Sequence, residues 1–150
     1  MSGHRVSIAS PQELVPIDRG RMRDIVRTVL NEESISDAEI SLAFVDNRTI
    51  HQLNKRYLGH DEPTDVLSFP LSDPSAKRLA GELVIGAEVA LAEAKNRGHN
   101  IQAELALYVI HGLLHLCEYD DKSPAAAHEM RERERRYLHL LGLPDIAPEE

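Results

Sequence analysis

Three observations predict an α+β fold for this chain. Its 150 residues suit a domain with a usable hydrophobic core. Four segments with strand-like patterns occur before residue 90, and helix-like patterns predominate after it. No internal repeat, low-complexity segment or interdomain linker interrupts the sequence, so we expect residues 1–150 to form a single domain.

Expected strands and helices alternate in the first half of the chain. Residues 6–8 form a short strand candidate, and residues 18–31 are expected to form a helix with one apolar side. The apolar residues of 39–45 recur with a strand-like period. Asn47 is of a residue type that caps helices, and it should begin a helix that ends near Tyr57.

Two further strands and three helices are expected in the second half. The strand at 66–69 is bounded by Pro63 and Pro70, and because proline cannot donate to a sheet it should be an edge strand or a strand end. The next strand is expected at 81–85. Three helices follow, the first from 87 to 96 with a stop at Gly98, the second from after Asn100 to near Cys117, and the third from Ser123-Pro124 to Gly142.

Two histidines on the second of these helices are spaced to share one metal ion. Residues four apart on a helix are stacked one turn above each other, so His111 and His115 point the same way. Asp121 follows beyond the expected end of the helix, and a chain that doubles back would bring its carboxylate to the same ion. Two imidazoles, a carboxylate and an open fourth position are what a hydrolytic zinc site needs.

The alternative is that both histidines are core residues bonded to carbonyl or carboxylate groups. Residues 101–116 are rich in Leu, Ala, Ile and Val, so this helix should be buried on most sides. Unpaired buried polar groups cost about 1–3 kcal/mol each, and a metal would satisfy both rings at once. Asp120 is the nearest rival to Asp121 as a ligand. Cys117 faces away at helical spacing and is expected to be a buried structural thiol.

The histidine motif resembles the zinc motif of the YbeY family of rRNA-maturation endoribonucleases. Residues 111–121 read HGLLHLCEYDD, and the family pattern is H-G-x-L-H-L-x-G-Y-D-H. Residues 53–70, LNKRYLGHDEPTDVLSFP, are similar to the family's L-N-x-x-Y/W-R-x-x-D-x-P-T-D-V-L-S-F-P, and GELVI at 81–85 resembles its G-D-I-V-I strand. The three blocks occur in the family's order, and the similarity covers about residues 40 to 140.

The resemblance implies a mixed sheet of about four strands, surrounded by helices, with a metzincin-like cleft. One Zn²⁺ would be held there by His111, His115 and Asp121. The implied function is a single-strand-specific, metal-dependent endoribonuclease in rRNA precursor maturation and ribosome quality control, in which zinc-bound water attacks the phosphodiester. Precursor rRNA and a ribosomal subunit or ribosomal protein are the implied partners. The resemblance makes Thr64, Asp65 and Ser68 candidates to line the cleft, and local turn capping is the alternative.

Three positions depart from the family pattern. Asp121 stands where the family has its third histidine, and the His-His-Asp set also suits Fe(II) or another divalent metal, which leaves the metal open. Glu118 replaces a glycine, so it must use another turn or adopt a positive φ that is uncommon for residues with a Cβ. Leu58 replaces an arginine with a proposed role at the RNA. The substrate-binding residues are therefore unknown, and His60 is a nearby cation-capable side chain.

Two other functions compete with the ribonuclease hypothesis. A metallopeptidase-like hydrolase of the H-E-x-x-H type carries a glutamate base directly after the first histidine, but this chain has Gly112 there. The other alternative is a non-catalytic ribosome-assembly factor with a structural metal, which the open set of three ligands opposes. No catalytic group is assigned beyond the metal-bound water.

The composition limits the possible partners. The net charge of −8 opposes broad electrostatic affinity for nucleic acid, so an RNA enzyme of this charge needs a local basic patch, a metal or a basic partner. Alternating Arg and Glu at 129–136 suggest a solvated, salt-bridged face, and His128 a surface or packing role. One cysteine suits a reducing cytosol, and no segment resembles a membrane span or signal peptide. We therefore expect a cytoplasmic protein without a membrane partner; its oligomeric state is not indicated.

Overall fold

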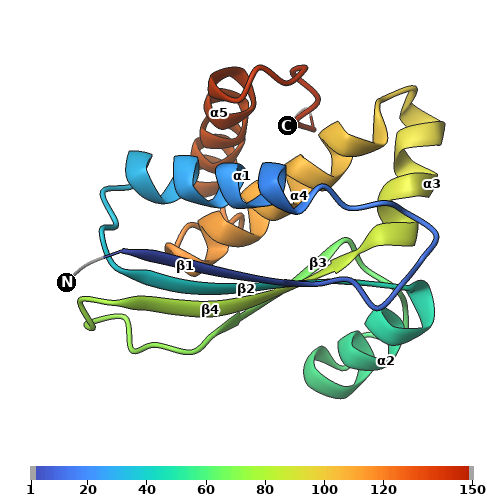
Figure 1. Cartoon of the computed structure of the whole chain (residues 1–150), viewed down its shortest axis with the longest axis horizontal. Helices are drawn as coiled ribbons and strands as arrows, with labels where there is room; N and C mark the ends of the chain where they lie inside the picture. The colour runs from blue at the N-terminus through green and yellow to red at the C-terminus, as the bar shows by residue number, and fades with distance from the viewer. Residues whose placement is uncertain (1–2, 149–150) are drawn as a thin grey trace.

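Residues 3–148, which the structure describes, form a four-stranded mixed sheet and five helices (Figure 1). The computed structural model confirms the predicted α+β fold. The strands are β1 (His4–Ala9), β2 (Ala38–Val45), β3 (Val66–Pro70) and β4 (Leu79–Gly86). The helices are α1 (Arg19–Glu32), α2 (Asn47–Leu58), α3 (Ala87–Arg97), α4 (Ile101–Leu116) and α5 (Pro124–Leu140).

The order of the strands places β3 at one edge of the sheet. The spatial order is β1-β2-β4-β3. Strand β2 runs parallel to both β1 and β4, whereas β3 pairs with β4 in the antiparallel direction. Pro70 is the last residue of β3, where it does not interrupt the ladder of hydrogen bonds. The prediction of an edge strand between Pro63 and Pro70 is confirmed.

The helices cover the two faces of the sheet unequally. Helices α1 and α4 lie across one face, α5 packs on α4, and α2 lies on the opposite face (Figure 1). Most of α4 is buried, as its apolar composition predicts, because it contacts the sheet, α1, α3 and α5. A histidine on α4 is therefore held by the most enclosed helix of the fold.

Side chains at the helix starts explain where the helices begin. The Ser123 hydroxyl accepts a hydrogen bond from the Ala126 amide at 3.1 Å, and Pro124 occupies the first turn of α5, as predicted. The expectation that Asn47 caps α2 is wrong by one residue. Asp46 is the cap, because its carboxylate accepts from the Thr49 amide at 2.8 Å.

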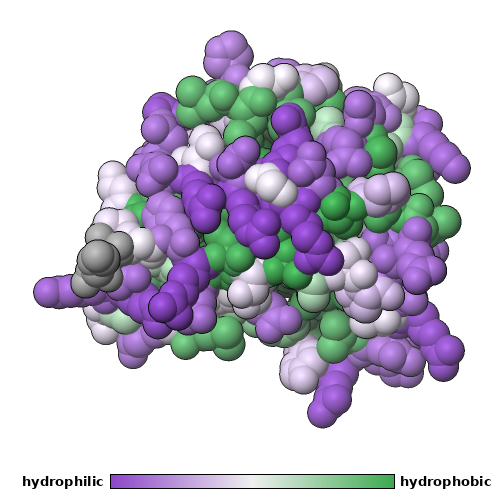
Figure 2. Space-filling model, in the orientation of Figure 1, coloured by the Kyte–Doolittle hydropathy of each residue, from purple (hydrophilic) through white to green (hydrophobic). Residues whose placement is uncertain are grey.

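The apolar core has two parts. The larger part fills the space between the sheet and the helices α1, α4 and α5. The smaller part lies under α2 and is formed by Val45, Ile50, Leu67 and Val84. Hydrophilic residues cover much of the face in Figure 2, with smaller hydrophobic areas between them. Among residues 3–148, no helix combines the length and apolarity needed to cross a membrane.

Candidate metal centre

The imidazoles of His111 and His115 face each other on one side of α4. Their Nε2 atoms are 3.0 Å apart, and their ring centroids are 4.6 Å apart at an interplanar angle of 81°. Gly112, between them in sequence, faces the sheet instead: a Cβ there would lie 2.9 Å from the Leu83 Cδ2 atom. One side of α4 therefore packs on the sheet, and another side presents two nitrogen atoms that can bind a metal.

The chain turns back after α4 and brings Asp121 to the two histidines. One ligand atom from each of His111, His115 and Asp121 lies within 4.8 Å of the other two. The turn is a Schellman motif, in which the Glu118 amide donates to the His115 carbonyl and the Tyr119 amide to the Leu114 carbonyl. Glu118 has a φ of 72°, so it adopts the uncommon conformation that the sequence left as one of two options.

The Nδ1 atoms of both histidines are bonded to the protein. His111 Nδ1 lies 2.7 Å from the Glu134 Oε2 atom, and His115 Nδ1 lies 3.1 Å from the Tyr119 carbonyl oxygen. A neutral imidazole that donates from Nδ1 leaves its Nε2 lone pair free for a metal. Partners of this kind orient metal-binding histidines in proteins and fix their tautomer.

Glu134 is the site residue that sequence reasoning missed. The alternation of Arg and Glu in α5 predicts a solvated face, but the Glu134 side chain is 0% exposed and also binds Arg131. A signal was present in the spacing, because the buried residues of α5 recur at helical intervals and include Glu134. They are Met130, Glu134, Tyr137 and Leu138.

The surroundings favour the neutral form of His115. Burial of the ring, and then the neighbouring His111, lower the pKa of His115, against smaller opposite effects of Asp121 and the Tyr119 carbonyl. Two neutral imidazoles that both donate from Nδ1 cannot form a hydrogen bond between their Nε2 atoms, because each Nε2 has only a lone pair. Metals bind neutral imidazole, so a metal ion is the better partner for both Nε2 atoms. Two imidazoles and one carboxylate form a donor set suited to Zn²⁺ or Fe(II).

The rival ligands lie outside this group of three. The Asp120 carboxylate instead accepts from the Lys122 amide at 2.9 Å. Cys117 caps α4 and is partly buried, and burial together with the carboxylates of Glu33 and Glu118 raises the pKa of its thiol to about 12. A thiol of this kind is a poor source of the thiolate that metals bind. His128 is an exposed residue of α5.

The three residues proposed to line the cleft behave differently. Thr64 and Asp65 line a hollow of about 470 Å³ together with His111, Asp121 and Glu134. Asp65 also makes the local turn contact considered as the alternative, because it accepts from the Val66 amide at 2.8 Å. Ser68 instead donates to the Gly112 carbonyl at 3.3 Å, which ties β3 to α4.

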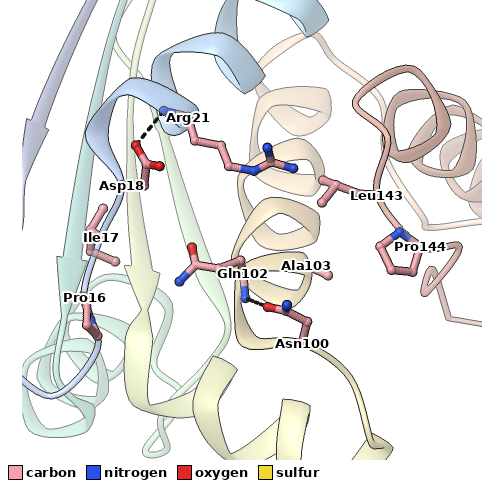
Figure 3. A pocket seen from close by; sticks show the side chains of 9 residues that line it. All are labelled: Pro16, Ile17, Asp18, Arg21, Asn100, Gln102, Ala103, Leu143 and Pro144. Carbon is pink, nitrogen blue, oxygen red and sulfur yellow. Dashed lines mark hydrogen bonds between the residues drawn. The ribbon is translucent and has the colours of Figure 1, made fainter.

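A larger hollow, of about 610 Å³, lies away from these residues. Pro16, Asp18 and Arg21 line one side of it, and Gln102 and Leu143 line another (Figure 3). It contains none of the histidines or acids of the metal group. The smaller hollow, which is lined by His111 and Asp121, is therefore the better candidate for chemistry.

Comparison with known proteins identifies the family. The family model described as Endoribonuclease YbeY matches residues 7–142. A protein named Endoribonuclease YbeY from Carboxydothermus hydrogenoformans is 40% identical over 139 residues, which are 91% of this chain and 96% of that protein. A protein of the same name from Sulfurovum sp. is 43% identical over 117 residues, covering 75% of this chain and 78% of its own.

A solved structure shares the fold of this chain. The solution structure of a Thermotoga maritima protein aligns with a TM-score of 0.62 and 26% identity, over 92% of this chain and 88% of that one. The mixed sheet, the histidine helix and these similarities agree with one another. The chain belongs to the YbeY family.

Proposed function

We propose that this protein is a metal-dependent endoribonuclease that cleaves single-stranded segments of rRNA precursors. The family membership supports the reaction class, because the relatives carry the name endoribonuclease. The single observation that carries the proposal is the convergence of His111, His115 and Asp121 within 4.8 Å beside a hollow. We assign these three residues as the ligands of one Zn²⁺ ion.

Each residue of the site has a distinct task. Glu134 and the Tyr119 carbonyl hold the two imidazoles with Nε2 toward the shared position. Asp121 adds a negative charge that a third histidine would lack. A divalent ion bound here supplies Lewis-acid stabilisation of phosphoryl charge and lowers the pKa of water. The Asp121 charge weakens this Lewis acidity and makes Fe(II) an alternative to zinc.

Packing around Gly112 argues against the peptidase alternative. A peptidase of the H-E-x-x-H type needs a glutamate at this position. Here a side chain would meet Leu83 at 2.9 Å and Val66 at 3.1 Å, because Gly112 lies directly on the sheet. A glutamate base at this position would therefore have to displace the side chains of Leu83 and Val66.

The acidic net charge points to a setting in which RNA is presented by a partner. At a net charge of −8 the protein has little general attraction for a polyanion. A basic ribosomal protein, free in the cytoplasm or on a ribosomal subunit, would supply the missing positive charge and present the precursor rRNA to the cleft. A role in rRNA maturation and ribosome quality control is inferred from the membership of the YbeY family and not from the charge.

Metal analysis and RNA cleavage by the same samples test the proposal. We expect about one equivalent of zinc per chain, with His115→Ala and Asp121→Ala losing both the metal and the cleavage of a single-stranded RNA. Asp120→Ala is the matched control and should retain both, because the Asp120 carboxylate accepts from the Lys122 amide in the adjacent turn and is outside the group of three ligands. Chelation should abolish cleavage, and added zinc should restore it.

Three results would contradict parts of the proposal. Zinc retained by Asp121→Ala would overturn the assignment of this ligand. Normal metal content with no RNA cleavage would overturn the ribonuclease proposal and favour an assembly factor whose metal is structural. Peptide hydrolysis by the zinc-loaded protein would favour the peptidase alternative.

A further inference from the structure

An exposed aromatic side chain lies at the end of α2, beside the edge strand β3. Tyr57 is 55% exposed, and its ring contacts the Phe69 ring edge to face, with the centroids 5.4 Å apart. The guanidinium carbon of Arg56 lies 5.4 Å from the centroid of the Tyr57 ring. Lys55, Arg56, Tyr57 and Phe69 together are termed the α2 surface.

Helix α2 is basic although the protein is acidic. Its sequence contains Arg48, Lys55 and Arg56 but no Asp or Glu, whereas the whole chain carries a net charge of −8. Among residues 3–148, no carboxylate forms an ion pair with Arg56. Lys55 approaches Asp61 at 3.9 Å, but both side chains are exposed, and such pairs are weak. The surface therefore offers positive charge to an anionic ligand.

Strand β3 connects the α2 surface to the metal centre. The Ser68 side chain faces α4, where it bonds to the Gly112 carbonyl at 3.3 Å. Successive side chains of a strand point to opposite faces, so Phe69 faces α2, where it packs on the smaller part of the core. Strand β3 is at the edge of the sheet. An RNA strand that leaves the cleft therefore has to pass over β3 and no other strand to reach the α2 surface.

We propose that the α2 surface binds single-stranded RNA that flanks the cleaved bond. One base stacks on the Tyr57 ring, and the neighbouring phosphates pair with Lys55 and Arg56. This inference rests on the proposed ribonuclease function and adds a binding site outside the cleft. The net charge of −8 opposes general affinity for RNA, and the α2 surface offsets this in part, because it gathers cations that can pair with phosphate on one helix of an otherwise acidic protein.

The chemistry of the α2 surface favours unpaired RNA. Stacking on an aromatic ring tolerates any base, because every base has a π-face. A base within a duplex is already stacked on its neighbours and does not offer that face to a protein. An exposed ring with the Arg56 guanidinium beside it, on a helix that also carries Lys55, thus matches a base and its phosphates together. Tyr57 would then contribute to a preference for single strands.

Steady-state cleavage with the zinc-loaded enzyme tests this site. The substrates are single-stranded RNAs of about 4 and about 12 nucleotides, of which only the longer can span the cleft and the α2 surface. Tyr57→Leu removes the ring but keeps an apolar side chain, and Tyr57→Phe keeps the ring. Leu140→Ala is the control for loss of an exposed apolar residue, since Leu140 is 51% exposed on α5.

We expect Tyr57→Leu to raise the KM of the longer RNA about 5- to 100-fold, with kcat and zinc content unchanged. Tyr57→Phe and Leu140→Ala should keep the wild-type KM, and the short RNA should not respond to any of the three. An unchanged KM of Tyr57→Leu for the longer RNA, with cleavage intact, would overturn the inference.

Binding of the same RNA, measured by fluorescence anisotropy, separates failure of this inference from failure of the proposed function. If the wild type binds the longer RNA in a Tyr57-dependent way but does not cleave it, the ribonuclease proposal fails and the binding site stands. Cleavage without dependence on Tyr57 overturns the binding site alone. If the wild type neither binds nor cleaves the longer RNA, both the binding site and the ribonuclease proposal are overturned.

Discussion

His111 and Glu134 are paired across the interface of α4 and α5, with His111 Nδ1 2.7 Å from Glu134 Oε2. The Glu134 side chain is fully buried, and its other oxygen binds Arg131. A buried carboxylate keeps its charge only when it is paired, so the histidine and the arginine stabilise it together. The same contact leaves His111 Nε2 free on the metal side. The contact between His111 and Glu134 therefore both joins α5 to α4 and orients the His111 ring as a metal ligand.

Replacing Glu134 by Gln should weaken zinc binding about 10- to 100-fold, the usual effect of losing a partner that orients a metal-binding histidine. The amide keeps the shape of the side chain, but it removes the charge that holds the Nδ1 proton of His111. Competition with a chromogenic zinc chelator measures the affinity.

Glu132→Gln is the matched control for this prediction. Glu132 lies on the same helix, its side chain is 55% exposed, and it pairs with Arg135 at the surface. Its replacement should leave zinc affinity unchanged. Equal affinities of Glu134→Gln and the wild type, with both proteins folded by circular dichroism, would show that the contact does not support the metal site.

Glu118→Gly should stabilise the protein by about 1 kcal/mol. Glu118 occupies the left-handed position of the Schellman turn after α4 with a φ of 72°, a conformation that costs roughly 1–2 kcal/mol for a residue with a Cβ. Urea unfolding measures the free energy. Glu118→Ala keeps a Cβ and should gain much less. If Ala and Gly were equally stabilising, the removal of the glutamate charge and not backbone strain would be the cause.

Much of the fold follows from local sequence patterns. The spacing of His111 and His115 predicts a shared face because it depends on helix geometry alone. The bounds of α1, α4 and α5 follow from apolar periodicity and caps, and the paired prolines place β3 at an edge.

Local sequence patterns predict less well the features that depend on contacts between residues far apart in the chain. The burial of Glu134 arises because α5 packs on α4. The helical spacing of Glu134 with the apolar residues of α5 is a sign of it, but the charge alternation predicts an exposed face. The return of Asp121 requires Glu118 to adopt a backbone conformation that its residue type disfavours. The edge-to-face contact of Tyr57 with Phe69 joins segments separated by a loop. The pairing of β3 with β4 fixes which face of the sheet Phe69 occupies.

Gly112→Ala should destabilise the protein by about 1–3 kcal/mol, the usual cost of overpacking a filled core. The new methyl group would meet Leu83 at 2.9 Å and Val66 at 3.1 Å. Gly20→Ala provides the contrast, because Gly20 is an exposed residue of α1 with only Asp18 near its Cβ position, at 3.6 Å. That substitution should stabilise by up to about 1 kcal/mol through helix propensity. Denaturant unfolding of both variants checks the prediction, and stabilisation by Gly112→Ala would contradict the close packing.

The Cys117 thiol should react slowly with iodoacetamide, and its rate should keep rising at high pH. Burial, followed by the carboxylates of Glu33 and Glu118, raises the pKa of Cys117 to about 12. Only the thiolate reacts, so the rate should increase about tenfold per pH unit through pH 9.5, whereas a peptide thiol levels off above about pH 8.5. Mass spectrometry of samples alkylated at pH 7 to 9.5 gives the rates, and circular dichroism verifies the fold at each pH. A plateau near pH 8.5 would mean that Cys117 forms a thiolate as easily as a free cysteine, and it would return Cys117 to the list of possible metal ligands.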